Sequence, residues 1–290
     1  MTDLVLPAPA KINLHLQVDG KRPDGYHLLD TSFAYVDIAD RLEFNIDQKL
    51  SVSCSRSHLS GPGNLVYVVL DALRKTYGIR QGMHVVISKH LPEKAGLGGG
   101  SSDAATAIMA ANDLWKLSLS TKELIDFSIP FGADIPCFLF GRASIASGTG
   151  ERLLPLSHSL PKGYVLLAYP GKGVSTMDVF RHHDTLIELT QNKQLDMIRN
   201  HSNSNVCVDR LGCNDLEVAA TSICPAIGHL LCVMRVSEGT SWMSGSGSTC
   251  VGLFPSRSKA SSLAEDLKSK GLASWTHIGS LLDLHPMKAA

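Results

Sequence analysis

The sequence lacks an excess of either charge, a long apolar run and an N-terminal export signal. Its 290 residues contain 27 Lys and Arg against 27 Asp and Glu, which argues against binding nucleic acid or a membrane surface through bulk charge. No apolar run is long enough to cross a bilayer, and Met1-Thr2-Asp3-Leu4 has neither the basic region nor the apolar core of a signal peptide. We therefore expect a cytoplasmic protein that binds no nucleic acid and no membrane.

Disulfide and metal-binding patterns are also missing. The seven cysteines are an odd number without a Cys-x-x-Cys pair, and reduced thiols are the simplest interpretation. Cys137, Cys232 and Cys250 lie in apolar runs, so we expect them in the core. The twelve histidines include no His-Glu-x-x-His motif, and His182-His183 is expected to be a surface pair rather than a metal site.

Glycine, in contrast, is concentrated in one stretch between Pro92 and Asp103, which reads PEKAGLGGGSSD. Residues 83–89 before it alternate between apolar and polar, which predicts a strand. Residues 104–115 after it place apolar side chains on one helical face. A helix N-terminus has unpaired N–H groups and the positive end of the helix dipole, and it binds anions, most often phosphate. The stretch therefore predicts a phosphate-binding loop.

Two well-known phosphate loops do not fit this stretch, and a turn without a ligand fits it poorly. A P-loop requires a Lys directly after its glycines, and none follows here. The dinucleotide fingerprint requires a glycine where Ser101 stands. A flexible turn is disfavoured because the glycines lie between a strand and a helix that Ser101, Ser102 and Asp103 can all cap. The stretch is a third kind of phosphate loop.

Three motifs, in order along the chain, resemble those of the GHMP kinases, a family that includes galactokinase, homoserine kinase and mevalonate kinase. They are PAKINL from Pro9, the glycine stretch from Pro92 and SGSGS from Ser244. The resemblance covers nearly the whole chain and implies a two-domain α+β fold. Residues 1–157 would form an ATP-binding domain like domain 2 of ribosomal protein S5, and residues 158–290 a ferredoxin-like substrate-binding domain. The active site would lie in the cleft between them.

The family pattern gives roles to three residues that look ordinary by themselves. On pattern alone, Lys11 and Asn13 are solvent-facing residues of a strand, and Asp134 caps a turn before Pro136. The resemblance implies that Asp134 is the catalytic base and that Lys11, also catalytic, lies close to the reacting hydroxyl. It further implies that Asn13 helps to hold substrate or phosphate.

The resemblance also implies ATP as the phosphoryl donor, with Mg²⁺ bridging its phosphates and keeping much of its water shell. The protein ligand of the metal is unassigned, with Ser101 or Ser102 as the best candidate. On pattern alone Asn64 is the N-cap of a helix from Leu65 to Tyr77, and by resemblance it lies at the adenine pocket. The residues expected to bind ATP are Asn64, Pro92, Lys94, Gly96, Leu97, Gly98, Gly99, Gly100, Ser101 and Ser102.

Tyr26 and His27 follow a turn-rich segment, residues 19–25, that predicts a hairpin. Packing at the base of this hairpin is one interpretation. In one branch of the family, however, Gly-Tyr-His marks recognition of a cytosine ring through stacking and hydrogen bonding. Thr176 and Phe180 match the same branch, whereas Met177 stands where Pro is common. The residues expected to bind substrate are Asn13, Tyr26, His27, Asp134, Thr176, Phe180, Gly245 and Ser246.

This branch implies phosphorylation of the 2-hydroxyl of a cytidine diphosphate-linked methylerythritol, in the non-mevalonate isoprenoid pathway, by a monomer or weak homodimer. Three alternatives remain. Another GHMP kinase for a small alcohol is disfavoured by Tyr26-His27, and a nucleotide-binding regulator without catalysis is disfavoured by the intact Lys11 and Asp134. An RNA-binding protein, suggested by the ribosomal-protein fold, is disfavoured by neutral charge and by the lack of a patch of aromatic and basic residues.

Several local structures follow from short patterns. Residues 28–46 alternate in stretches and look like two strands. Ser120 to Glu123 predicts a capping box, and Pro130 predicts an early helix end. Asn214, within Asn-Asp-Leu-Glu, is expected to cap a helix and support packing rather than take part in chemistry. The tail from Leu281 is expected to be frayed.

Overall fold

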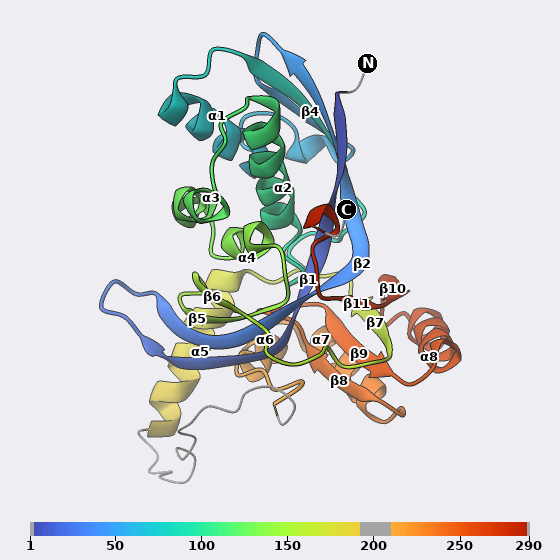
Figure 1. The fold of residues 1–290 in the computed structure, drawn as a ribbon. Helices are drawn as coiled ribbons and strands as arrows, with labels where there is room; N and C mark the ends of the chain where they lie inside the picture. The colour runs from blue at the N-terminus through green and yellow to red at the C-terminus, as the bar shows by residue number, and fades with distance from the viewer. Residues whose placement is uncertain (1–2, 192–209, 289–290) are drawn as a thin grey trace.

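Two β-sheets organise the fold (Figure 1). The structure is a computed structural model, and it describes residues 3–191 and 210–288. The strands are β1 (Leu4–Lys21), β2 (His27–Asp47), β3 (Ser51–Cys54), β4 (Gly82–Ser88), β5 (Ser144–Gly148), β6 (Arg152–Pro155), β7 (Tyr164–Tyr169), β8 (Thr240–Met243), β9 (Cys250–Phe254), β10 (Trp275–Gly279) and β11 (Leu281–Leu282). The α-helices are α1 (Leu65–Tyr77), α2 (Gly99–Leu114), α3 (Thr121–Ser128), α4 (Ile135–Phe140), α5 (Thr176–Gln191), α6 (Glu217–Ile223), α7 (Pro225–Arg235) and α8 (Arg257–Ser269).

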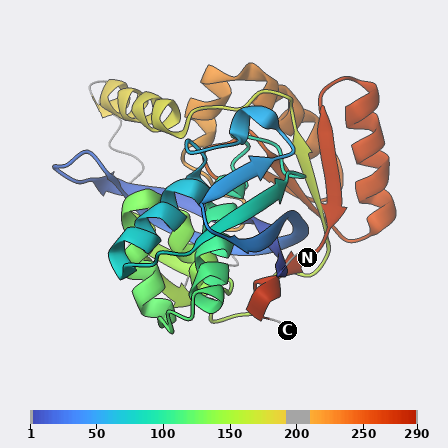
Figure 2. The same ribbon diagram turned by 90° about the horizontal axis from the view of Figure 1, so that it is seen from above.

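The larger sheet has seven strands and the smaller sheet has four. In the larger one the path runs β3-β4-β2-β5-β6, and β1 and β11 also pair with β2. The smaller sheet has the order β10-β7-β9-β8 and is antiparallel throughout. Helix α2 packs on β1 and β2, whereas α7 and α8 pack on the smaller sheet (Figures 1 and 2). This arrangement of strands and helices agrees with the predicted α+β class.

β1 and β2 form one long hairpin around the turn predicted at residues 19–25. β2 is a single strand of 21 residues, so the prediction of two strands over residues 28–46 was wrong. The alternation breaks because β2 contains a bulge: Pro9 pairs with Ala39 but Ala10 pairs with Val36, which leaves two residues of β2 without partners on β1. A bulge bends a strand and shifts its faces without reversing the chain.

Helix α2 is buried on all sides, not on one face as predicted. Every residue from Ser102 to Ala111 is buried, because α1, α4, β1 and β2 all pack against it. The helix begins at Gly99, and its N-cap is Gly98 in the left-handed conformation, with no side-chain cap. The predicted caps at residues 101–103 were therefore wrong, since these residues lie inside the first two turns. The capping box at Ser120 and the helix end before Pro130 are confirmed.

Two predictions about cysteine and histidine were wrong, and both concern which side of a helix a residue faces. Cys137 and Cys250 are buried as expected, but Cys232 is exposed because it lies on the side of α7 opposite its buried residues. His183 is buried, since it shares one face of α5 with the buried Val179. Among residues 3–191 and 210–288, no cluster of His, Cys, Asp and Glu forms a candidate metal site.

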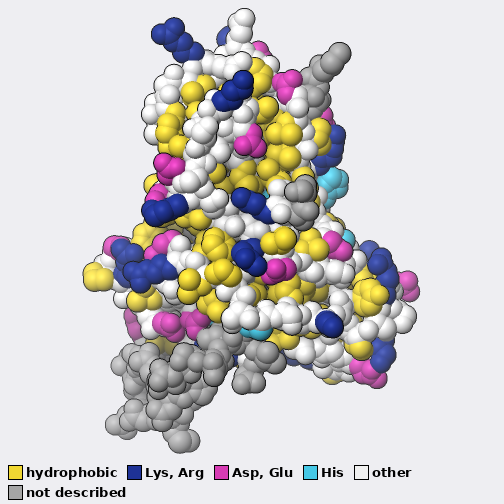
Figure 3. Space-filling view, viewed as in Figure 1, with side chains coloured by type: hydrophobic (Ala, Val, Ile, Leu, Met, Phe, Trp, Pro, Cys, Tyr) yellow, Lys and Arg dark blue, Asp and Glu magenta, His cyan; other side chains and the backbone are white. Residues whose placement is uncertain are grey.

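The surface agrees with the balanced composition. On the face shown in Figure 3, basic and acidic side chains are interspersed rather than gathered by sign. Within the described part of the chain, none of the helices has the length and hydropathy to cross a membrane.

Residues 281–288 are ordered, contrary to the prediction of a frayed tail from Leu281. Leu281 and Leu282 pair with β2, and the N–H of Ala143 donates to the Asp283 carbonyl over 2.7 Å. His285 is fully buried and meets the ring of Tyr35 edge-on, with centroids 5.5 Å apart. The chain thus returns to the larger sheet after β10, and the domain boundary between residues 157 and 158 stays a prediction.

His285 is expected to make stability depend on pH. Burial, assisted by the positive charge of Lys288, lowers the pKa of His285 from 6.5 to about 4. Between these two values the unfolded chain binds a proton that the folded chain does not. The free energy of unfolding therefore falls as the pH falls from 6.5 to 4, by about 3 kcal/mol at most from this group. His285→Phe keeps an aromatic ring against Tyr35 and removes the titration.

The measurement is the thermal midpoint of both proteins between pH 4 and pH 7. The wild type should lose more stability than His285→Phe as the pH falls. Carboxylates titrate in both proteins, so only the difference between the two curves reports on His285. Parallel curves would contradict the prediction.

Candidate active site

The three motifs meet at one place, where β1 passes between two loops. The N–H of Lys11 donates to the Leu97 carbonyl over 3.0 Å. The N–H of Asn13 donates to Ser244 Oγ over 3.2 Å, and this hydroxyl donates to the Gly96 carbonyl over 3.0 Å. Segments far apart in sequence are therefore fixed side by side through β1.

Two glycines allow this close approach. Gly96 has φ +75°, and a Cβ atom there would lie 2.3 Å from the Ser244 carbonyl oxygen. Gly98 has φ +68°, and a Cβ atom there would lie 2.9 Å from the ring of Phe138. Both the backbone conformation and the available space exclude a side chain at these positions. The contacts with Ser244 and Phe138 therefore require glycine at these two positions, independently of any ligand.

Lys11 and Asp134 form an ion pair at this junction. Lys11 Nζ lies 3.5 Å from Asp134 Oδ2 and donates to Asn13 Oδ1 over 2.8 Å. It also lies 5.0 Å from the centre of the Phe33 ring. Lys11 and Asn13 are only 3% and 2% exposed, so the interpretation of both as solvent-facing strand residues was wrong.

Asp134 is positioned at the start of α4 but does not cap it. It occupies the N-cap position without a side-chain capping bond, contrary to the prediction from its turn sequence. The side chain is 38% exposed, whereas its partner Lys11 is 4% exposed. A carboxylate that is held by a buried ammonium and open to solvent on one side can reach a bound molecule. This geometry suits proton transfer.

The start of α2 provides backbone donors beside this pair. The N–H of Ser102 donates to the Gly98 carbonyl over 2.8 Å, so this N–H is paired within the helix, and a role of Ser102 in binding ATP stays a prediction. The N–H groups of Gly99, Gly100 and Ser101 come before it and have no intrahelical acceptor by helix geometry. Ser102 Oγ is buried and has no hydrogen-bond partner among the described residues.

Three other residues predicted to bind ATP, namely Asn64, Pro92 and Lys94, differ in their burial and in their contacts. Asn64 caps α1 as predicted: its Oδ1 accepts from the N–H of Val66 over 2.8 Å, and its Nδ2 donates to the Leu59 carbonyl over 2.7 Å. Its role at an adenine pocket stays a prediction. Pro92 is partly buried, and Lys94 is exposed with φ +50°.

A second group of predicted residues meets between the β1–β2 hairpin and α5. The rings of His27 and Phe180 stack with centroids 4.6 Å apart and 25° between their planes. Thr176 Oγ1 lies 2.9 Å from Ser246 Oγ. Tyr26, next to His27, is 64% exposed. These contacts bring together four of the predicted substrate residues from three separate segments.

The third motif joins the two groups into one site. A Cβ atom at Gly245 would lie 3.3 Å from Asn13 Oδ1, and the next residue, Ser246, contacts Thr176. Asn214 braces this loop, since its Nδ2 donates to the carbonyls of Met243 and Gly245 over 2.7 and 2.8 Å. Its Oδ1 accepts from the N–H of Leu216 before α6. These bonds agree with the predicted packing role of Asn214, but the predicted capping role was wrong: the N-cap of α6 is Leu216, without a side-chain capping bond.

Asp184 is a candidate site residue that the sequence did not reveal. Its Oδ1 lies 2.6 Å from His27 Nε2, and its Oδ2 accepts from Lys21 Nζ over 2.6 Å. Burial by itself would raise the pKa of Asp184, but hydrogen bonds from Lys21 and His27 outweigh it and the pKa is lowered. The available signal was its spacing of four residues from Phe180, which puts both on one face of α5.

Comparisons with known families agree with this geometry. Residues 64–142 match the GHMP kinases N terminal domain, and residues 186–273 match the GHMP kinases C terminal domain. A crystal structure of 4-(cytidine 5'-diphospho)-2C-methyl-D-erythritol kinase superimposes with a TM-score of 0.75 at 31% identity, covering 96% of this chain and 99% of that one. L. major mevalonate kinase has the same fold, with a TM-score of 0.68 at 15% identity over 98% of this chain and 97% of that one. The predicted GHMP kinase fold is confirmed.

Curated relatives show to which group within the GHMP kinases this chain is most similar among those compared. A 4-diphosphocytidyl-2-C-methyl-D-erythritol kinase from Citrifermentans bemidjiense is 39% identical over 93% of this chain and 97% of its own length. The protein of the same name from Chelativorans sp. is 41% identical over 89% of both chains. Identity of this extent covers most of this chain and most of each relative. The chain therefore belongs to the GHMP kinase family and, within it, to the 4-diphosphocytidyl-2-C-methyl-D-erythritol kinases.

Proposed function

We propose that this chain transfers the γ-phosphoryl group of ATP to the 2-hydroxyl of 4-diphosphocytidyl-2-C-methyl-D-erythritol, giving the 2-phosphate and ADP. This reaction is a step of the non-mevalonate isoprenoid pathway. The observation that carries the proposal is the Lys11–Asp134 ion pair, which lies beside the glycine loop that begins at Pro92. Gly245 and Ser246 connect this pair to the stacked rings of His27 and Phe180. One end of the site suits phosphoryl transfer and the other suits a nucleobase.

Phosphoryl transfer depends mainly on positioning and on stabilisation of negative charge. The N–H groups of Gly99, Gly100 and Ser101 bind the phosphates of ATP, assisted by the positive end of the α2 dipole. Mg²⁺, when bound, neutralises part of the phosphate charge. The Ser101 hydroxyl and the buried Ser102 hydroxyl, which has no partner among the described residues, would hold this ion.

Asp134 and Lys11 act on the alcohol. The exposed side of the Asp134 carboxylate accepts the proton of the 2-hydroxyl as its oxygen attacks phosphorus. The ammonium of Lys11 faces the same region and stabilises the negative charge that develops on the transferring group. Its hydrogen bond to Asn13, 2.8 Å long, holds it in place. The proton thus ends on Asp134 and the phosphoryl group on the alcohol oxygen.

The cytidine end of the substrate is held by the residues between the hairpin and α5. A cytosine ring stacks on the exposed aromatic side chain of Tyr26 or on Phe180. Asp184 accepts from His27 Nε2, which leaves the Nδ1 atom of a neutral His27 as an acceptor for an amino group. We expect the enzyme to act in the cytoplasm, as a monomer or weak homodimer.

The test is a substrate panel with purified protein, ATP and Mg²⁺. ADP release is followed for 4-diphosphocytidyl-2-C-methyl-D-erythritol, mevalonate, homoserine and galactose, and ³¹P NMR identifies the phosphorylated position. Turnover of the cytidine compound alone, with a new 2-phosphate, is expected. A higher kcat/KM with another alcohol would favour another GHMP kinase. ATP binding without turnover of any alcohol would favour a nucleotide-binding regulator.

A further inference from the structure

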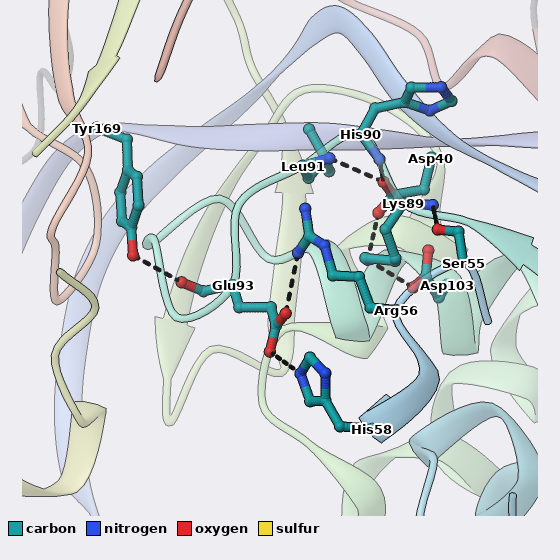
Figure 4. A network of polar contacts seen from close by, with 10 residues as sticks. All are labelled: Asp40, Ser55, Arg56, His58, Lys89, His90, Leu91, Glu93, Asp103 and Tyr169. Carbon is teal, nitrogen blue, oxygen red and sulfur yellow. Dashed lines mark hydrogen bonds and ion pairs between the residues drawn. The ribbon is translucent and has the colours of Figure 1, made fainter. Parts of the chain in front are cut away.

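A buried cluster of three charged residues lies behind the glycine loop (Figure 4). Lys89 directly follows β4, Asp40 belongs to β2 and Asp103 lies in the second turn of α2. The side chains of Lys89 and Asp103 are each 6% exposed, and that of Asp40 is fully buried. Lys89 Nζ donates to both carboxylates, to Asp103 over 2.8 Å. The reaction described above uses none of these groups.

The cluster ties together the two ends of the loop. One oxygen of Asp40 accepts from the N–H groups of His90 and Leu91, over 2.6 and 2.9 Å, at the point where the chain leaves β4. The other oxygen of Asp40 accepts from Lys89, and Lys89 in turn holds Asp103 on the helix that the loop leads into. Asp40 and Lys89 therefore connect the start of the loop to the helix after it, by a route that bypasses the glycines.

The ammonium of Lys89 also lies close to the expected phosphate site. A Cβ atom at Gly99, the first residue of α2, would lie 3.4 Å from Lys89 Nζ. The cluster therefore sits directly behind the first backbone N–H groups of the helix. A small displacement of Asp103 or Lys89 moves those groups.

Stability alone is a weak explanation for this cluster. Removing three charged groups from water costs free energy that their mutual attraction often fails to recover. Burial raises the pKa of Asp103 even though the positive charge of Lys89 acts in the opposite direction, and Asp103 Oδ1 has no hydrogen-bond partner among the described residues. Apolar residues would fill this space at a lower cost in free energy. Directional hydrogen bonds, in contrast, fix the relative position of two backbone segments.

We propose that Lys89, Asp40 and Asp103 are positioning residues for the phosphates of ATP, which they serve by fixing the glycine loop relative to the N-terminus of α2. This inference rests on the proposed use of ATP. It concerns the phosphoryl donor alone: the contacts of the cluster are with residues 90 and 91 and with α2, whereas the residues assigned to the cytidine end lie at the β1–β2 turn, on α5 and in the loop after β8.

The test uses Asp103→Ala, which detaches the helix but leaves Lys89 and Asp40 as a balanced ion pair. We expect the KM for ATP to rise at least tenfold and the KM for the alcohol to change less than twofold. Asp103→Asn restores an acceptor of the same size for Lys89, and it should recover most of the loss. Leu267→Ala, at a fully buried position of α8, is the matched control. It should lower the thermal midpoint without changing the KM for ATP.

Each outcome supports or overturns the inference. If Asp103→Ala lowers the thermal midpoint as Leu267→Ala does and leaves the KM for ATP unchanged, the cluster is only structural and the inference fails. If Asp103→Ala does not fold, Lys89→Arg keeps the charge while changing its length and shape. A selective rise in the KM for ATP supports the inference, and an unchanged value overturns it. A wild type that neither binds nor uses ATP overturns the proposed function as well.

Discussion

Replacing Asp134 by Asn is expected to lower kcat by about 10²- to 10⁴-fold, the usual contribution of a positioned general base. The amide has nearly the same shape as the carboxylate but cannot accept the proton of the attacking hydroxyl. Asp134 is 38% exposed and makes no capping bond, and the amide oxygen of Asn can still face Lys11, which keeps its hydrogen bond to Asn13. We expect the thermal midpoint and both KM values to stay close to those of the wild type.

The measurement is steady-state kinetics of ADP release together with thermal denaturation. Asp126→Asn is the matched control, because Asp126 is exposed and forms a surface ion pair with Lys122. It should leave kcat unchanged. A folded Asp134→Asn protein with wild-type kcat would exclude Asp134 as the base. Loss of activity together with a collapse in stability would instead give Asp134 a structural role.

Gly96→Ala is expected to lower kcat/KM for ATP by about 100-fold or more, with a clear fall in the thermal midpoint. The new methyl group would lie 2.3 Å from the Ser244 carbonyl oxygen, and the backbone at Gly96 has φ +75°. The left-handed conformation costs an alanine about 1–2 kcal/mol, and overpacking adds about 1–3 kcal/mol. The glycine loop and the loop after β8 must move apart to relieve this contact. A misplacement of about 1 Å can cost about 10²-fold in rate.

Gly228→Ala is the matched control for this substitution. Gly228 lies inside α7, and a Cβ atom there would make ordinary contacts at 3.7 Å with Thr221. Alanine is the better helix former, by about 1 kcal/mol, so this variant should be at least as stable as the wild type and fully active. A wild-type kcat/KM for ATP in Gly96→Ala would show that the contact between the two loops does not position the phosphate site.

Features that depend on a few neighbouring residues were predictable. The cap at Asn64, the capping box at Ser120 and the helix end before Pro130 each follow from hydrogen bonds or steric limits within one turn of chain. The glycine loop between β4 and α2 belongs to the same class, because it follows a strand pattern and precedes a helix pattern. Local chemistry fixes such features wherever the segment lies in the fold.

The errors arose where distant segments decide the environment of a residue. α2 was expected to have one apolar face, but its small side chains let two helices and two strands pack around it. The tail from Leu281 was expected to fray, but β2 offers it an edge and Tyr35 a ring contact. The break in alternation within β2 is a bulge, which depends on pairing with β1. None of these partners can be read from the segment itself.

The candidate site divides in the same way. The motifs identify the groups available for phosphoryl transfer, namely a lysine, an aspartate and a glycine loop in a recognisable order. The folded structure was needed to find that Lys11 is buried against Asp134, that Asp184 holds His27, and that Lys89 joins Asp40 to Asp103. The reason is physical: a motif specifies chemical groups and local backbone geometry, whereas burial, charge pairing and contact distance depend on which segments the folded sheets bring together.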